Sequence, residues 1–138
     1  MIQQDINIPK HNWSIRIYYE VTSVWGGLIA RDLIDAGIKG NDAKTALSVI
    51  KKSDLNTGLT FSNYDKRRSI VVVFNGSNGA QFFNSLIHES LHVQRHICEA
   101  DGVDPYSEDA AYLLGDMVGL MYPKIKGLLC GCSKHKGA

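Results

Sequence analysis

The stretch His88-Glu89-Ser90-Leu91-His92 lies in a segment, residues 79–100, whose apolar residues recur with the period of an α-helix. Successive residues are 100° apart around a helix, so positions four apart lie one turn apart on the same side. The two histidines therefore share a face, and Glu89 lies beside them. The pattern predicts a long helix around which the rest of the fold is arranged.

The apolar residues of this helix cover about half of its circumference, which is wide for a helix on a protein surface. We therefore expect the helix to be buried against both a sheet and a second helix. The expected apolar positions are Phe82, Phe83, Leu86, Ile87, Leu91, Val93, Ile97 and Cys98. The expected polar positions are Asn84, Ser85, His88, Glu89, His92, Arg95, His96 and Glu99.

The first half of the chain begins with a strand pattern and continues with a helix pattern. Residues 14–21 alternate apolar and polar side chains, which predicts a half-buried strand. Residues 24–36 have the helical period, and Gly37 is expected to end that helix. The expected inward residues are Ile15, Ile17, Tyr19 and Val21 in the strand, and Trp25, Leu28, Ile29 and Leu33 in the helix.

A second helix and a hairpin follow. Asp42 is expected to cap a helix that runs to about Lys52. Residues 59–63 and 69–74 predict an antiparallel hairpin. Its second arm is a continuous apolar run, which indicates burial on both faces, whereas the more polar first arm is expected nearer an edge. The expected apolar face of the helix consists of Ala43, Ala46, Leu47 and Ile50.

Another helix is expected after the central one. Residues 101–105 predict a tight turn, and either Asp104 or Ser107 is expected to cap a helix over residues 106–121. Its expected apolar face consists of Ala110, Leu113, Leu114, Met117, Val118 and Met121. Its narrow opposite stripe consists of Glu108, Tyr112, Gly115, Asp116 and Gly119.

The composition is typical of one globular domain. The chain has 138 residues and a formal net charge of +1, so no broad basic surface for nucleic acid is expected. No apolar run is long enough for a membrane span, and the polar first ten residues lack the apolar centre of a signal peptide. We therefore expect a cytoplasmic protein that binds neither nucleic acid nor membrane.

These patterns together predict an α+β fold over residues 1–138, with a small, mainly antiparallel sheet packed against the central helix and three further helices. Residues 1–12 are expected to form a loose arm and residues 123–138 a mobile tail. The three cysteines are too few for a disulfide scaffold, and Cys130 with Cys132 is a weak pattern for a second metal site.

The two histidines are placed to bind a metal ion. His88 and His92 can direct their rings at one point about 2 Å from each nitrogen, which is the usual zinc–nitrogen distance. Glu89 lies about 100° around the helix, beside that point rather than on it. This position suits a general base that takes a proton from zinc-bound water.

Catalytic zinc usually has three protein ligands, so a third is expected. His96 is rejected because it lies about 12 Å along the helix axis from His88. Gly115 and Gly119 indicate that the stripe of the next helix packs closely beside the histidines. That packing makes Glu108 the expected third ligand, with Asp116 as the alternative ligand or as a partner of a histidine nitrogen. Tyr112, one turn from Glu108, is expected to contact a reaction intermediate.

The residues also allow two other interpretations. The first is a metal-binding module without turnover, which has a structural role or binds another protein. The second is a polar helix face on which two histidines occur by accident, in which case Glu108 is an ordinary carboxylate in a first helical turn.

The sequence His88-Glu89-x-x-His92, then fifteen residues, then Glu108-x-x-Ala111-Tyr112-Leu113-x-Gly115, resembles the small zincin-like metallopeptidases of bacterial and phage genomes. It is similar to the gluzincins, in which two histidines and a downstream glutamate bind zinc. The resemblance implies a zincin-like fold, a Zn²⁺ ion, Glu89 as general base and a peptide or protein substrate. It covers residues 82–121. Ser107 stands where the gluzincin pattern has an asparagine, and the Ser-Asp after the glutamate is absent.

Overall fold

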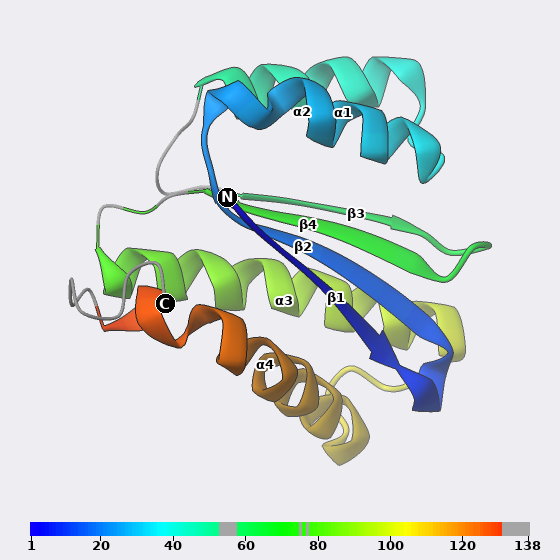
Figure 1. The fold of residues 1–138 in the computed structure, drawn as a ribbon. Helices are drawn as coiled ribbons and strands as arrows, with labels where there is room; N and C mark the ends of the chain where they lie inside the picture. Colours follow the sequence, from blue (N-terminus) through cyan, green and yellow to red (C-terminus); the bar gives the residue numbers. More distant parts are fainter. Residues whose placement is uncertain (53–57, 75, 77, 131–138) are drawn as a thin grey trace.

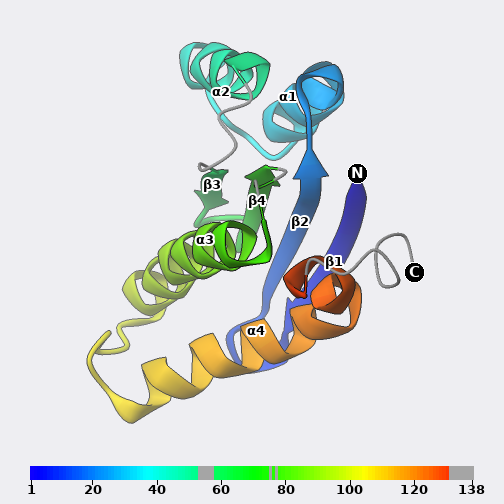
Figure 2. The same ribbon diagram turned by 90° about the vertical axis from the view of Figure 1, so that its left-hand side faces the viewer.

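The computed structural model describes residues 1–52, 58–74, 76 and 78–130. These residues form an α+β fold with a small four-stranded mixed sheet and four α-helices (Figure 1). The strands are β1 (Ile2–Ile8), β2 (Trp13–Val21), β3 (Gly58–Asn63) and β4 (Arg68–Phe74), and the helices are α1 (Gly26–Asp35), α2 (Gly40–Lys52), α3 (Gly79–Asp101) and α4 (Glu108–Leu129). Helices α1 and α2 cover one face of the sheet, and α3 and α4 cover the other (Figure 2).

The strands have the order β1-β2-β4-β3, so the predicted hairpin lies at one edge of the sheet. β3 pairs antiparallel with β4, with Phe61 opposite Ile70, and β1 pairs antiparallel with β2. β2 and β4 run parallel, which makes the sheet mixed. β4 sends Val71 towards α3 and α4 and Val72 towards α1 and α2. The hairpin, the outer position of β3 and the burial of β4 on both faces are therefore confirmed.

β2 differs from the expected half-buried strand, because both of its faces are covered. Ile15 and Ile17 contact the α3–α4 layer, whereas Tyr18 and Val21 contact the α1–α2 layer. Glu20 has a φ of 54°, and the pairing with β4 shifts between Tyr18 and Val21. This bulge turns Val21 to the face opposite the one that strict alternation predicts.

The expectation of a loose arm over residues 1–12 is wrong. Most of this segment is β1, which pairs with β2 along its whole length and places Ile6 opposite Ile15. A short 3-10 helix, η1 (Pro9–His11), follows. Ile6 and Ile8 are buried in the α3–α4 layer. Burial of alternate isoleucines on one face, together with the ladder of hydrogen bonds, orders the strand.

The α1–α2 layer follows the predicted boundaries with two differences. Gly37 has a φ of 103° just after α1, and Ile29 and Leu33 are buried beneath that helix, as expected. Leu28 is instead 49% exposed, because it lies on the outer side of α1. α2 begins before Asp42, so this residue lies in the first turn, where a negative charge is favourable, and does not cap the helix.

α3 is the long helix that the sequence predicts. The side chain of Asn78 caps it by accepting a hydrogen bond of 2.9 Å from the backbone N–H of Gln81. The helix packs against β3, β4 and α4, so the expected burial against both a sheet and a helix is confirmed. Phe83, which was expected to be inside, is exposed.

α4 begins after Ser107, whose hydroxyl accepts a hydrogen bond from the N–H of Ala110 and is therefore the cap. The helix continues through Pro123 to Leu129, so the expected mobile tail is wrong for residues 123–129. Ile125 and Leu128 are buried beyond the proline and hold this part of the helix. Residues 131–138, with Cys132, lie outside the described residues. None of the described helices has the length and apolar character that a membrane span needs.

Candidate metal centre

His88 and His92 lie on the exposed side of α3, one turn apart. Their Nε2 atoms are 3.2 Å apart, and the ring centres are 4.9 Å apart with the planes at 72°. The helix alone produces this pairing, because residues four apart share a side. Both rings therefore direct the same nitrogen at the same small volume.

The distance between these nitrogens can be compared with that of a zinc site. Two nitrogens that each lie 2.0–2.1 Å from one tetrahedral ion are about 3.3–3.4 Å apart. The observed 3.2 Å is close to this value. It also suits an N–H···N hydrogen bond between the two rings. The pair therefore has the donor type and the spacing of two zinc ligands.

Glu89 completes the group. The potential ligand atoms of His88, Glu89 and His92 all lie within 4.8 Å of one another, so the group could bind a metal ion. Unlike the histidines, Glu89 is only 4% exposed, because it points under β3. Thr60 on β3 donates a hydrogen bond of 2.9 Å to Oε2 of this carboxylate. One carboxylate oxygen is thereby fixed by the sheet.

β3 lies close against Glu89, and a glycine allows this approach. A Cβ atom on Gly58 would lie 2.5 Å from the carbonyl oxygen of Val72 and 3.0 Å from Cγ of Glu89. Gly58, Thr60 and Ser62 alternate along β3, and both hydroxyls bond to residues of α3. These contacts of Gly58, Thr60 and Ser62 were not predicted from the sequence. The available signal was the run of small residues at every second position of a strand that was expected near an edge.

His96 lies one turn beyond His92, with 6.5 Å between ring centres, and does not belong to the cluster. Its Nδ1 is 2.7 Å from the hydroxyl of Ser62, which in turn lies 2.7 Å from the hydroxyl of Ser69. Trp13 donates its indole N–H to Ser69. Burial lowers the pKa of His96 below the usual histidine value, and the nearby His92 lowers it further. His96 is thus part of the contact between α3 and the sheet.

The structure does not bring Glu108 or Asp116 to the histidines. Both are exposed on α4, as is Tyr112, which is 64% exposed. A Cβ atom on Gly115 or Gly119 would meet nothing within 4 Å, so these glycines mark no close helix contact within the described chain. The expectation that this stripe packs beside the histidines is wrong.

The packing of α3 explains why Glu108 and Asp116 of α4 lie away from the histidines. α4 contacts α3 through Gln94, which donates to the carbonyl of Ala110, and through Ser90, whose hydroxyl lies 3.7 Å from the sulfur of Met121. Ser90 lies about 200° around the helix from His88. α4 therefore lies on the flank of α3 away from the histidines, while β3 lies on the nearer flank.

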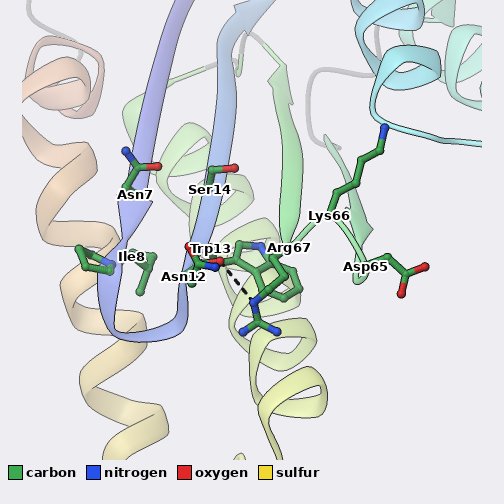
Figure 3. Close-up of a pocket in the computed structure, with 9 residues that line it drawn as sticks. Asn7, Ile8, Asn12, Trp13, Ser14, Asp65, Lys66 and Arg67 are labelled. Carbon is green, nitrogen blue, oxygen red and sulfur yellow. Dashed lines mark hydrogen bonds between the residues drawn. The ribbon is translucent and has the colours of Figure 1, made fainter.

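A separate hollow lies at the other end of the sheet, between the β1–β2 and β3–β4 turns (Figure 3). It has a volume of about 370 Å³ and contains none of the three residues of the metal cluster. Arg67 lies at its edge and donates hydrogen bonds to the backbone carbonyls of His11 and Asn12. The guanidinium also lies over the ring of Trp13, 5.2 Å from its centre. Through these hydrogen bonds, Arg67 holds the β1–β2 turn and the β3–β4 turn together.

Comparison with protein-family models, curated proteins and solved structures found no significant match to this chain.

Proposed function

We propose that this chain is a zinc-dependent hydrolase with a zincin-like fold, and that its substrate is a peptide or protein. The observation that carries the proposal is the pair of Nε2 atoms, 3.2 Å apart, with a buried carboxylate held beside them. Two imidazoles and an adjacent carboxylate are the donors and the general base that hydrolytic zinc sites use.

The residues have separate roles in this proposal. His88 and His92 would hold the ion through Nε2. When bound, zinc lowers the pKa of water and polarises a carbonyl group. Glu89 accepts the proton of the attacking water and later transfers it to the leaving amine. Thr60 holds one oxygen of Glu89, which leaves the other oxygen available for the proton.

The outer edge of β3 is the proposed binding place for an extended peptide. β3 is the last strand on this side of the sheet, and it lies on the flank of α3 nearest the histidines. A peptide that pairs with its backbone would lie alongside His88 and His92. The main-chain hydrogen bonds would position the scissile carbonyl without requiring a particular side chain.

One observation favours a second candidate, a metal-binding module without turnover. Among the described residues, the metal cluster contains two histidines and Glu89, and no further carboxylate or imidazole. If Glu89 itself binds the ion, it is not available as a base. Such a protein would keep the metal and lose the hydrolytic step.

Zinc binding is tested first. Isothermal titration calorimetry on protein treated with a chelator should show one zinc ion per chain, and the ion should raise the melting temperature. His92→Ala should abolish both effects. His96→Ala is the matched control, because this histidine lies on the same helix outside the cluster, and it should keep the ion. If the wild type binds no zinc, both candidates are wrong.

The two candidates are separated by Glu89→Gln, assayed on a peptide library against the wild type. The hydrolase proposal expects the variant to bind zinc and to lose cleavage by about 10²-fold or more, because a general base contributes at least this factor. A variant that loses the ion, beside a wild type that cleaves nothing, supports the module without turnover.

A further inference from the structure

The outer face of α4 has no partner within the described part of the chain. Tyr112 and Tyr122 are 64% and 57% exposed on it. Glu108 and Lys126, near the two ends of the helix, are exposed as well. Tyrosines with this exposure are common in surfaces that bind another protein.

The residues of this face are arranged symmetrically about Met117. Gly115 and Gly119 lie two positions on either side of it, Tyr112 and Tyr122 five, and Glu108 and Lys126 nine. At 100° per residue, all of them lie within about 40° of the direction opposite Met117. Met117 is fully buried, so this direction points to solvent. We call these residues, Glu108, Tyr112, Gly115, Gly119, Tyr122 and Lys126, the α4 outer face.

A face with this symmetry is complementary to itself under a twofold axis. In an antiparallel pairing centred on Met117, Glu108 lies opposite Lys126 of the second copy, so opposite charges meet at both ends. Tyr112 lies opposite Tyr122 of the second copy. In a twofold interface, if one residue of the first copy contacts a second residue of the other copy, the reverse contact also forms. The order of the residues along α4 satisfies this requirement.

The glycines fit the centre of such a contact. A Cβ atom on Gly115 or Gly119 would meet nothing within 4 Å, so neither glycine is needed for packing inside the described chain. Glycine weakens a helix interior relative to alanine, and close approach of a second helix is a use for the missing side chain.

We propose that the α4 outer face joins two copies of this chain in an antiparallel homodimer. A single pair of helices buries less than the roughly 1,200–2,000 Å² of a standard interface, so the dimer is weak and forms at high protein concentration. α4 contacts α3 on the flank away from His88 and His92. The dimer therefore leaves the metal cluster open and does not depend on the proposed zinc chemistry.

Charge reversal tests the pairing by sedimentation velocity over a series of concentrations. Glu108→Lys should weaken the dimer about tenfold, because two attractive pairs become repulsive. The double variant Glu108→Lys with Lys126→Glu should restore it. Asp109→Lys is the matched control: it makes the same kind of charge change in the same first turn, 100° away from the face.

Gly115→Leu tests the close approach. The side chain has open space in one chain, so the variant should fold and remain monomeric at all concentrations. Circular dichroism confirms the fold. The proposal is overturned if the wild type is monomeric at the highest concentration. It is also overturned if a wild-type dimer is unaffected by Gly115→Leu, or if the double charge reversal fails to restore what the single change removes.

Discussion

Thr60 is the residue that fixes the carboxylate of the candidate site. Glu89 is almost fully buried, and a buried carboxylate without a hydrogen-bond donor is costly. The hydroxyl of Thr60 supplies that donor at 2.9 Å from Oε2. The orientation of the proposed base is therefore set by the edge strand, and the histidines are set by the helix alone.

Replacing Thr60 measures this bond. Thr60→Val keeps the shape of the side chain and removes the hydroxyl, so it should lower the free energy of unfolding by about 1–3 kcal/mol. Thr60→Ser keeps the hydroxyl and should cost less than about 1 kcal/mol, the value of a partly buried methyl group. Urea denaturation gives both values. Equal losses in the two variants would show that the bond to Glu89 contributes nothing.

The sequence was sufficient to predict the histidine pair, but it was not sufficient to predict which residues surround the pair. The spacing of His88 and His92 depends only on helix geometry, and the structure has them with their Nε2 atoms 3.2 Å apart. Thr60 lies 29 positions before Glu89, and their contact depends on how β3 lies on α3. The position of Glu108 also depends on tertiary packing. The residue pattern of α3 does not show on which of its flanks α4 packs, so the expectation that Glu108 lies beside the histidines was wrong.

At the scale of elements, one junction joins the β1–β2 turn, the β3–β4 turn and the end of α3. Arg67 donates two hydrogen bonds, of 2.6 and 2.7 Å, to the carboxylate of Asp101. Nδ1 of His11 lies 2.7 Å from the same carboxylate. The hydrogen bonds from Arg67 and His11 lower the pKa of Asp101 below its usual value. Two turns and the end of a helix, which are far apart in the sequence, thus depend on the carboxylate of Asp101.

The lowered pKa of Asp101 predicts how the stability of the protein depends on pH. Because the folded-state pKa lies below the unfolded-state value of about 3.9, ionised Asp101 stabilises the fold above that value. This stabilisation is lost as the pH falls through the folded-state pKa. Asp101→Asn should therefore lower the urea midpoint clearly at pH 7 and by less at about pH 3, where ionisation of Asp101 stabilises the fold less. An equal loss at both pH values would show that the charge of Asp101 does not stabilise the fold.

Sequence periodicity predicted some elements and missed others for identifiable reasons. The continuous apolar run of β4 and the turn before it were sufficient for the hairpin. β1 was missed although Ile6 and Ile8 have the period of a strand, because polar neighbours made the segment resemble an arm. The bulge at Glu20 has no comparable signal in the residue pattern, since it depends on the pairing of β2 with β4.

At the scale of the whole molecule, the sheet separates two apolar clusters and belongs to both. One cluster lies between the sheet and α3 with α4, and the other lies between the sheet and α1 with α2. β2 and β4 contribute to each, for example through Val71 and Val72 on opposite faces. Loss of either helix layer would expose apolar side chains of the same two central strands. The two layers should therefore unfold together.

The two tryptophans allow a direct test, because each reports on a different layer. Trp13 is buried in the α3–α4 cluster, and Trp25 packs against the α1–α2 cluster. Trp25→Phe leaves Trp13 as the reporter, and Trp13→Phe leaves Trp25. In each variant, the urea midpoint from fluorescence should equal the midpoint from far-ultraviolet circular dichroism, because a shared sheet makes unfolding cooperative. The comparison is made within one variant, so a change in stability caused by the substitution does not affect it. A fluorescence transition of Trp25 that precedes the circular dichroism transition would show that the α1–α2 layer separates first, and that β2 and β4 do not couple the two layers.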